Sequence, residues 1–270
     1  MSIRLIVLDL DGTTIGDDYV VPARVAAAIR AACERGIDVT LATGRSYAGT
    51  RRYAEELGLE APLICYQGGA IVEAATGASL YSATVSRESV RAALDLARAN
   101  KWYLVLYDQR NAFVDEWIMP AEFYEQLIHP ETILVPDLRE CLERDMAKFL
   151  FMDEPERIPA IEAVLREHFG ERLEIVRSHA RFVEGNPPGV SKGSALELLA
   201  GRLGVSRSEV LAIGDSDNDV SMLAWAGVGV AMGQGTAAAR AAADWIAPPF
   251  AAGGAAVAIE RFALHGQGLP

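Results

Sequence analysis

The chain is poor in cysteine. Its 270 residues contain only three, Cys33, Cys65 and Cys141. They form no Cys-x-x-Cys pair and no spacing typical of a zinc site. An odd number of widely spaced cysteines indicates small, reduced core residues, which excludes a disulfide-stapled or zinc-ribbon fold.

Long apolar runs are also missing. No apolar stretch approaches the roughly 20 residues that a membrane-spanning helix needs. The N-terminus has no charged segment followed by an apolar run and a cleavage site. The sequence therefore predicts a soluble, cytoplasmic protein without a membrane partner.

Positive charge is scarce as well. The sequence has 25 lysines and arginines and 37 acidic residues, which gives a net charge of −12. Arg51 and Arg52 form an isolated pair rather than a basic stripe, and nucleic-acid binding needs such a stripe. Nucleic acid is thus not an expected partner. The acidity favours solubility and indicates that cations can gather where acids converge.

What the sequence does contain is strand–helix alternation. Short apolar runs rich in branched residues, such as IRLIVLDL, IDVTLAT and EVLAIGD, predict buried strands, and amphipathic stretches between them predict helices. This order predicts an α/β fold: a doubly wound, Rossmann-like parallel sheet with helices on both faces. The 51% hydrophobic content is enough for a large core.

The strand–helix alternation is interrupted between residues 85 and 188. Two amphipathic helices, SRESVRAALDLARAN and PERIPAIEAVLREHFG, accompany strands that pair mostly as hairpins. We therefore predict an α+β cap domain, residues 85–188, inserted into a core domain made of residues 1–84 and 189–270. The sequence NPPG at 186–189 is the predicted hinge, and the oligomeric state is not predictable.

Polar residues follow the predicted core strands, where α/β sheets bind ligands. Asp9 and Asp11 are two positions apart, so both side chains can address one point. Asp215 arrives from another strand. Converging carboxylates repel each other unless a cation joins them, and oxygen-only ligands favour Mg²⁺.

Three further residues suit a phosphate dianion. Thr43 offers a hydroxyl, Gly44 a backbone N–H that a ligand can approach, and Lys192 a positive charge. Each feature alone has a plainer explanation, since Asp-Gly favours turns, acids favour helix starts and most lysines are solvated. Their order on successive strand ends favours a phosphate site, where an aspartate can act as nucleophile.

Four motifs carry a family resemblance. DLDGT at 9–13, ATGR at 42–45, GVSKGSAL at 189–196 and GDSDND at 214–219 resemble, in order, those of the haloacid dehalogenase superfamily. The chain looks most like the Cof-type sugar-phosphate phosphatases, whose C2-type cap lies between the second and third motifs. Small departures are Gln67-Gly68-Gly69 where Asn-Gly-Ala is usual, Gln234 for Asn, and Thr14-Ile15 for leucines.

The resemblance implies roles for the motif residues. Asp9 is the expected nucleophile, which forms an aspartyl-phosphate, and Asp11 the acid and base. Mg²⁺ is expected to bind Asp9, the Asp11 backbone carbonyl and Asp215. The expected phosphate-binding and supporting residues are Thr43, Gly44, Lys192, Asn218 and Asp219.

The resemblance also implies a substrate, a small phosphorylated metabolite and foremost a sugar phosphate. Pyridoxal phosphate, a nucleotide, a sugar-acid phosphate, mannosyl-3-phosphoglycerate and sucrose phosphate stay open. So do two other functions, a phosphomutase and a non-catalytic sensor of a phosphorylated metabolite. Because caps choose the leaving group, the candidate cap contacts are Arg177, His179 and Arg181, followed by Arg110, Asn111 and Glu184.

Overall fold

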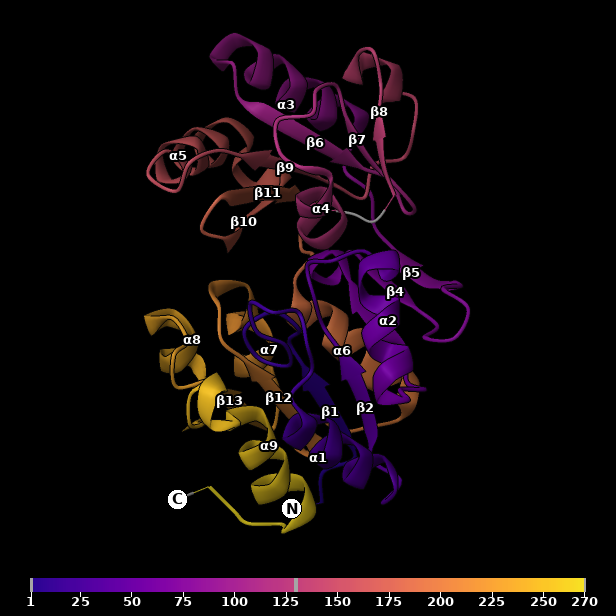
Figure 1. The fold of residues 1–270 in the computed structure, drawn as a ribbon, viewed down its shortest axis with the longest axis vertical. Coiled ribbons are helices and arrows are strands. Elements are labelled where there is room, and N and C mark those ends of the chain that lie inside the picture. The colour runs from indigo at the N-terminus through magenta and orange to yellow at the C-terminus, as the bar shows by residue number, and fades with distance from the viewer. Residues whose placement is uncertain (1, 129–130, 270) are drawn as a thin grey trace.

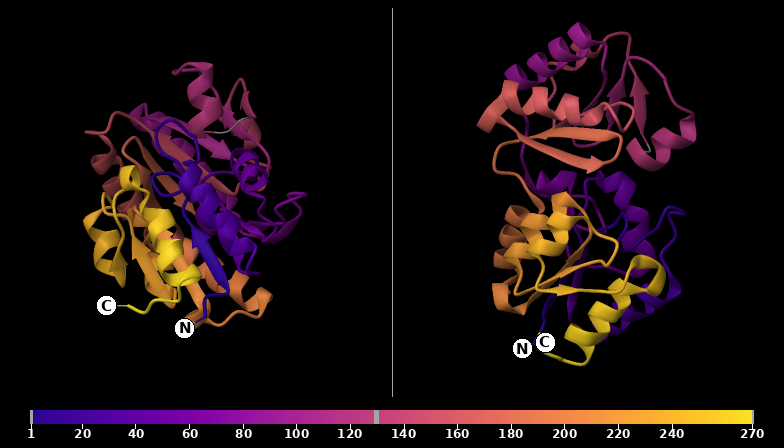
Figure 2. Two further views of the ribbon diagram at one scale, coloured as in Figure 1. Left: turned by 60° about the horizontal axis from the view of Figure 1, so that its bottom comes forward. Right: turned by 90° about the vertical axis from the view of Figure 1, so that its left-hand side faces the viewer.

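The computed structural model describes residues 2–128 and 131–269, which form two lobes (Figure 1). One lobe is built on a parallel sheet and the other on a six-stranded, mainly antiparallel sheet. The N- and C-terminal ends lie together on the first lobe, far from the second (Figure 2).

The first lobe contains a five-stranded parallel sheet, as predicted. Its strands in spatial order are β14 (Trp245–Ile246), β13 (Val228–Ala231), β12 (Val210–Gly214), β1 (Leu5–Leu8) and β2 (Asp38–Leu41). A parallel bridge between Ala42 and Ile64 joins β3 (Leu63–Cys65) to this sheet. β3 also pairs with β4 (Ala70–Val72), and β4 pairs with β5 (Ser79–Ser82), in both cases antiparallel.

Helices cover both faces of the parallel sheet because side chains alternate along each strand. Leu5 and Val7 of β1 belong to a core cluster with residues of α6 (Lys192–Leu203) and α7 (Val220–Trp225). Ile6 and Leu8 belong to another cluster with residues of α1 (Ala23–Cys33) and α9 (Gly254–Ala258). The remaining helices of this lobe are α2 (Tyr47–Leu57) and α8 (Ala237–Ala242).

The second lobe is the α+β cap. Its sheet has the order β10 (Glu174–His179), β11 (Phe182–Asn186), β9 (Lys148–Met152), β6 (Tyr103–Tyr107), β7 (Ala112–Val114) and β8 (Thr132–Leu134). Neighbours are antiparallel except β7 and β8, which are parallel. Its helices are α3 (Arg87–Asn100), α5 (Ile158–Phe169) and the short α4 (Ala121–Phe123). The domain limits at 84/85 and 188/189 stay a prediction.

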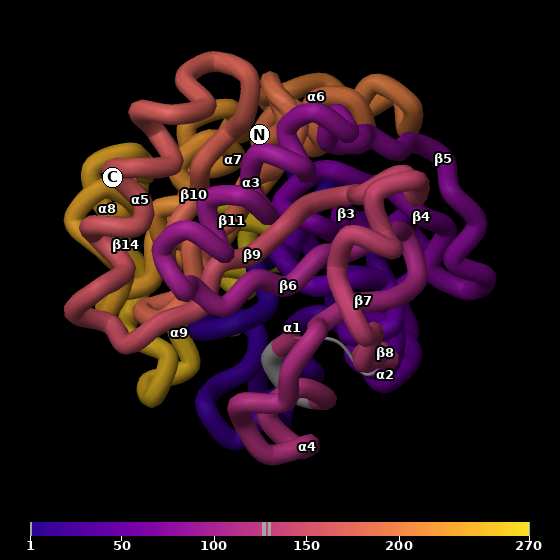
Figure 3. The backbone as a smooth tube through the Cα atoms, turned by 90° about the horizontal axis from the view of Figure 1, so that it is seen from above, coloured from indigo at the N-terminus to yellow at the C-terminus, as the bar shows by residue number. Residues whose placement is uncertain are grey.

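Alternation along β9 decides what the cap presents to the first lobe. Phe149 and Phe151 pack into the cap's own core with residues of α3 and α5. Lys148 and Leu150 are therefore on the opposite sheet face and line a cavity shared with residues of the first lobe. Seen from above, the cap strands β6, β9 and β11 lie over the first lobe (Figure 3).

Candidate active site

A cavity of about 160 Å³ lies between the two lobes. Residues that follow β1, β2 and β12, among them Asp9, Thr43 and Asn218, line one side of it. Residues of the cap strands β6, β9, β10 and β11 line the other side. The cavity thus joins the carboxyl ends of the parallel strands to the cap sheet.

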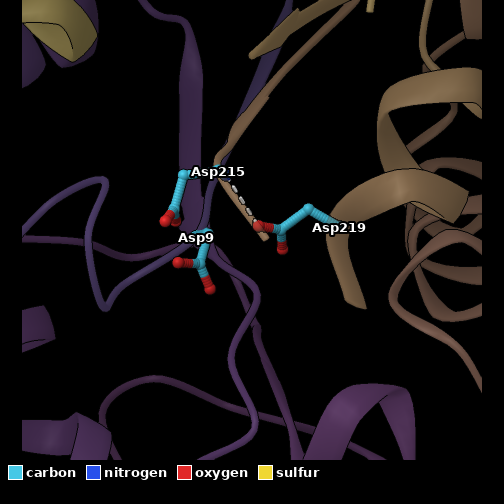
Figure 4. Close-up of side chains that lie close together, drawn as sticks. All are labelled: Asp9, Asp215 and Asp219. Atoms are coloured by element: carbon cyan, nitrogen blue, oxygen red, sulfur yellow. Dashed lines mark hydrogen bonds between the residues drawn. The ribbon is translucent and has the colours of Figure 1, made fainter. Parts of the chain in front are cut away.

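A lysine lies at the centre of the acidic residues. Lys192, only 1% exposed, donates to Asp9 Oδ1 at 2.5 Å and to Asp219 Oδ1 at 2.6 Å. Asp9, Asp215 and Asp219 each offer an oxygen atom within 4.8 Å of the others (Figure 4). Three carboxylates and one ammonium group leave this cluster with an excess of negative charge.

Both carboxylate oxygens of Asp219 accept hydrogen bonds from within the protein. Its Oδ1 accepts from Lys192, and its Oδ2 accepts from the backbone N–H groups of Asp215 and Ser216 at 2.8 and 2.9 Å. The last part of GDSDND therefore folds back to fix Lys192. Asp215 is held more loosely, by the hydroxyls of Thr13 at 3.1 Å and Ser216 at 3.2 Å.

The charges in the cluster shift one another's pKa. Burial and then the nearby Asp219 raise the pKa of Asp9 well above its usual value, although Lys192 opposes this. Burial and Asp219 likewise raise the pKa of Asp215 to about 6. Burial lowers the pKa of Lys192, but Asp219 and Asp9 outweigh it and raise that pKa above its usual range. Like charges are thus held together at a cost that a cation would remove.

The donor set fits a hard divalent cation. Asp9 and Asp215 supply carboxylate oxygens, and neither histidine nor cysteine belongs to the metal-capable cluster among the described residues. Oxygen ligands without soft donors suit Mg²⁺. Asp219 is held by Lys192 and two backbone N–H groups at 2.6–2.9 Å, whereas Asp215 accepts two longer hydrogen bonds from hydroxyls. Asp9 and Asp215 are therefore the better candidates for direct ligands.

Asp11 lines the same cavity but is engaged differently. Its two oxygens accept from Arg45, Oδ2 from Nε at 2.8 Å and Oδ1 from Nη2 at 2.6 Å. The Asp11 side chain is 49% exposed, whereas that of Arg45 is 11% exposed. Asp11 therefore faces the open part of the cavity, and Asp9 the closed end.

Thr43 and Gly44, the residues after β2 that are expected to bind phosphate, are closely packed. Thr43 Oγ1 accepts from the backbone N–H of Arg45 at 3.1 Å. A Cβ on Gly44 would lie 2.3 Å from Gln67 Nε2, and the Gly44 carbonyl accepts from Lys148 Nζ at 2.9 Å. No side chain larger than hydrogen fits at position 44 without displacing Gln67.

Gln67 was noted in the sequence only as a departure from the usual motif. It is 2% exposed, lines the cavity, and has a left-handed backbone with φ of 58°. Its Oε1 accepts from Asn218 Nδ2 at 2.9 Å, which couples the third strand's loop to GDSDND. Tyr66 before it is also left-handed, with φ of 52°. Two such residues in succession are strained, and strain of this kind clusters at functional sites.

Of the three cap residues predicted to contact substrate, one lines the cavity. His179 does so, and burial lowers its pKa. Arg177 instead pairs with Glu162 at 2.5 Å, and Arg181 pairs with Glu154. Arg110 and Asn111 are not among the described residues that line it, whereas Glu184 is.

The sequence analysis missed Lys148. It lies on β9 beside the cavity, buried against Glu184 at 2.8 Å. The available signal was a lysine at the start of the otherwise apolar strand KFLFM, on the same alternation as Leu150.

Comparison with known proteins decides the family. The model of the haloacid dehalogenase-like hydrolases matches residues 6–259. The chain belongs to this family. Among the described residues, no helix has both the length and the apolar character needed to cross a membrane.

Related proteins match this chain over most of their own length. The 5-amino-6-(5-phospho-D-ribitylamino)uracil phosphatase YitU of Bacillus subtilis is 29% identical over 89% of this chain and 90% of its own. The HMP-PP phosphatase of Serratia proteamaculans is 29% identical over 85% and 84%. A haloacid dehalogenase-like hydrolase from Bacteroides thetaiotaomicron is 30% identical with a TM-score of 0.85, over 97% of this chain and all of the other.

Proposed function

We propose that this hydrolase is a Mg²⁺-dependent phosphatase that removes phosphate from a small phosphorylated metabolite, foremost a sugar phosphate. The observation that carries the proposal is the buried Lys192, which joins Asp9 and Asp219 beside Asp215 at the end of the parallel sheet. Two relatives that span most of the chain are named as phosphatases of phosphorylated small molecules. Phosphoryl transfer needs this kind of positioning and charge neutralisation.

In the proposed reaction Asp9 is the nucleophile. A carboxylate oxygen of Asp9 attacks phosphorus, the bond from phosphorus to the ester oxygen breaks, and the leaving oxygen takes that electron pair. Lys192, at 2.5 Å from Asp9 Oδ1, fixes the carboxylate and offsets charge on the phosphoryl group. The product of this step is an aspartyl-phosphate.

Asp11 is the proposed proton carrier. It gives a proton to the leaving oxygen, then takes one from the water that attacks phosphorus and releases Asp9. Both Asp11 oxygens accept from Arg45 in the structure, so Asp11 exchanges this partner for the leaving oxygen during the reaction. Its 49% exposure leaves room for that movement.

The metal and the phosphate have separate proposed ligands. Asp9 and Asp215 would hold Mg²⁺, with the Asp11 backbone carbonyl as a further ligand, and the bound ion would neutralise charge on the phosphoryl oxygens. Thr43, Gly44 and Asn218 would contact the phosphoryl group, and Asp219 positions Lys192.

Asp9→Asn tests the proposal because it keeps the size of the side chain and removes the nucleophilic oxygen. Phosphate release from p-nitrophenyl phosphate should fall by about a thousandfold or more, as expected when a nucleophile is removed. Near wild-type release would contradict the mechanism. Conversion of hexose 1-phosphate to hexose 6-phosphate without free phosphate would show a mutase, and binding without turnover would show a sensor.

A further inference from the structure

The cap carries a buried ion pair that the proposed chemistry does not use. Lys148 Nζ donates to Glu184 Oε2 at 2.8 Å, and the two side chains are only 4% and 3% exposed. Burying an ion pair costs desolvation energy, and an apolar pair of similar volume is often as stable or more so. Stability alone therefore does not explain why the two charges are there.

The position of the pair points to the ligand. The pair lies in the wall of the cavity that also contains Asp9, and Lys148 Nζ donates as well to the Gly44 carbonyl at 2.9 Å. The pair thus connects the cap to the loop proposed to bind phosphate. A leaving group attached to that phosphate would lie toward the cap side of the cavity, which this pair lines.

The unused hydrogen-bonding capacity of the pair suits a hydroxyl group. An ammonium group has three N–H donors. Lys148 uses two of them in hydrogen bonds and lies 4.8 Å from the centre of the Tyr107 ring, so within the described part of the chain the third N–H has no oxygen acceptor. Each Glu184 oxygen accepts one hydrogen bond, Oε2 from Lys148 and Oε1 from Ser178, and retains a second lone pair. A hydroxyl both donates and accepts, so it can use a donor and an acceptor side by side.

The charge balance disfavours a second anionic group on the substrate. Among the described residues that line the cavity, the permanent cations are Arg45 and Lys148, and each is paired with an acid, Asp11 or Glu184. Asp17 adds a further negative charge. A carboxylate or second phosphate on the leaving group would have to break one of these pairs.

We propose that Lys148 and Glu184 determine specificity by binding the hydroxyl groups of a neutral, polyhydroxylated leaving group. This inference rests on the proposed phosphatase function. It favours phosphate monoesters of uncharged sugars or polyols over phosphorylated sugar acids.

The test compares two variants with four substrates. Glu184→Gln keeps the shape and removes the charge, and the double variant Lys148→Met/Glu184→Leu replaces the pair by apolar side chains of similar size, an exchange that is often neutral for stability. The substrates are glucose 6-phosphate, ribose 5-phosphate, 6-phosphogluconate and p-nitrophenyl phosphate, each measured as kcat/KM with Mg²⁺. Arg157→Met is the control, since it removes a cap cation that pairs with Asp153 away from this cavity.

In the wild type, kcat/KM should be higher for glucose 6-phosphate than for 6-phosphogluconate. In both variants, kcat/KM for the two sugar phosphates should fall about tenfold to a hundredfold further than for p-nitrophenyl phosphate, as expected for lost charged hydrogen bonds. The control should keep the wild-type ratios.

Equal losses for all substrates, unchanged ratios, or a preference for 6-phosphogluconate would overturn the inference and leave the phosphatase function intact. A folded wild type that releases no phosphate from any of the four compounds would instead overturn the proposed function, and this inference with it.

Discussion

Lys192 stays charged inside the protein because carboxylates surround it. Asp219 is bonded to Lys192 on one oxygen and to two backbone N–H groups on the other, so it fixes the ammonium group toward Asp9. A charge buried to this extent is stable only when it is paired. The same lysine also donates to Asp9 Oδ1 and so holds the proposed nucleophile in place.

Asp219→Asn should test whether Asp219 positions Lys192 while leaving the proposed nucleophile Asp9 in place. The amide cannot offset the charge of Lys192, so we expect a tenfold to hundredfold fall in kcat, roughly the effect of one lost charged hydrogen bond. Steady-state kinetics with p-nitrophenyl phosphate measures it, with Asp217→Asn as the control in the same loop. Equal effects of the two substitutions would contradict the role given to Asp219.

Gly68 shows how closely this site is packed. Its φ is +100°, and a Cβ there would lie 2.2 Å from the Ser191 carbonyl oxygen. Gly68→Ala should therefore lower the free energy of unfolding by about 2–5 kcal/mol, the sum of left-handed strain and overpacking. Urea denaturation measures this change.

Gly36→Ala is the matched control for the backbone contribution. Gly36 has a similar φ of +75°, but nothing lies within 4 Å of the added Cβ. Only the left-handed strain remains, about 1–2 kcal/mol. If the two alanine variants lost the same stability, the close approach between Gly68 and Ser191 would be unimportant.

Single residues were predictable where a motif contained them. The acids of DLDGT and GDSDND stand out because carboxylates interrupt or end apolar runs. Lys148 and Gln67 did not stand out, because most lysines are solvated and the partners Glu184 and Asn218 are distant in sequence. Only the folded chain brings these partners together.

At the scale of elements, the N-terminus of α6 positions Lys192. Ser191 is the N-cap, its side chain accepts from the Ser194 N–H, and Lys192 is the first helical residue. The N-cap residue Ser191 therefore fixes the backbone from which Lys192 reaches Asp9. Ser86 caps α3 in the same way, but α3 carries no residue of the site.

Ser191→Ala and Ser86→Ala should accordingly lose similar stability but differ in activity. Each should lower the free energy of unfolding by about 1 kcal/mol. Only Ser191→Ala should also lower kcat for p-nitrophenyl phosphate, because only its helix carries Lys192. Loss of activity in both variants would mean that the overall stability of the protein, rather than the position of Lys192, limits the reaction.

Elements with regular burial were predictable. The predicted strand EVLAIGD contains β12, and the predicted helix SRESVRAALDLARAN contains α3. The segment between β7 and β9 gave no prediction, and it contains α4 and β8. Ile133 and Leu134 of β8 are 41% and 50% exposed, so its apolar residues do not alternate with burial. A pattern method depends on that alternation.

At the scale of the whole molecule, the cavity exists only because two lobes meet. The motifs predict the half that we propose binds metal and phosphate, and the cap supplies Lys148, His179 and Glu184. Sequence alternation predicts which cap residues share a face, but it does not tell which face meets the first lobe. The leaving-group side of the site therefore needed the structure.

Metal binding should stabilise the whole protein because Mg²⁺ relieves repulsion between Asp9 and Asp215. Thermal unfolding at neutral pH should shift to a higher Tm on addition of Mg²⁺ and return on addition of a chelator, as ligand linkage requires. Asp215→Asn should reduce the shift strongly. An identical Tm with Mg²⁺ and with chelator would contradict the assigned metal site.

The most direct test of the central claim is phosphate release from a panel of sugar phosphates, pyridoxal phosphate and nucleotides, with Mg²⁺ and with chelator. The account predicts Mg²⁺-dependent release, fastest from an uncharged sugar phosphate, and its loss in Asp9→Asn. No release from any compound by folded, Mg²⁺-bound protein, or equal release in the chelator, would contradict it.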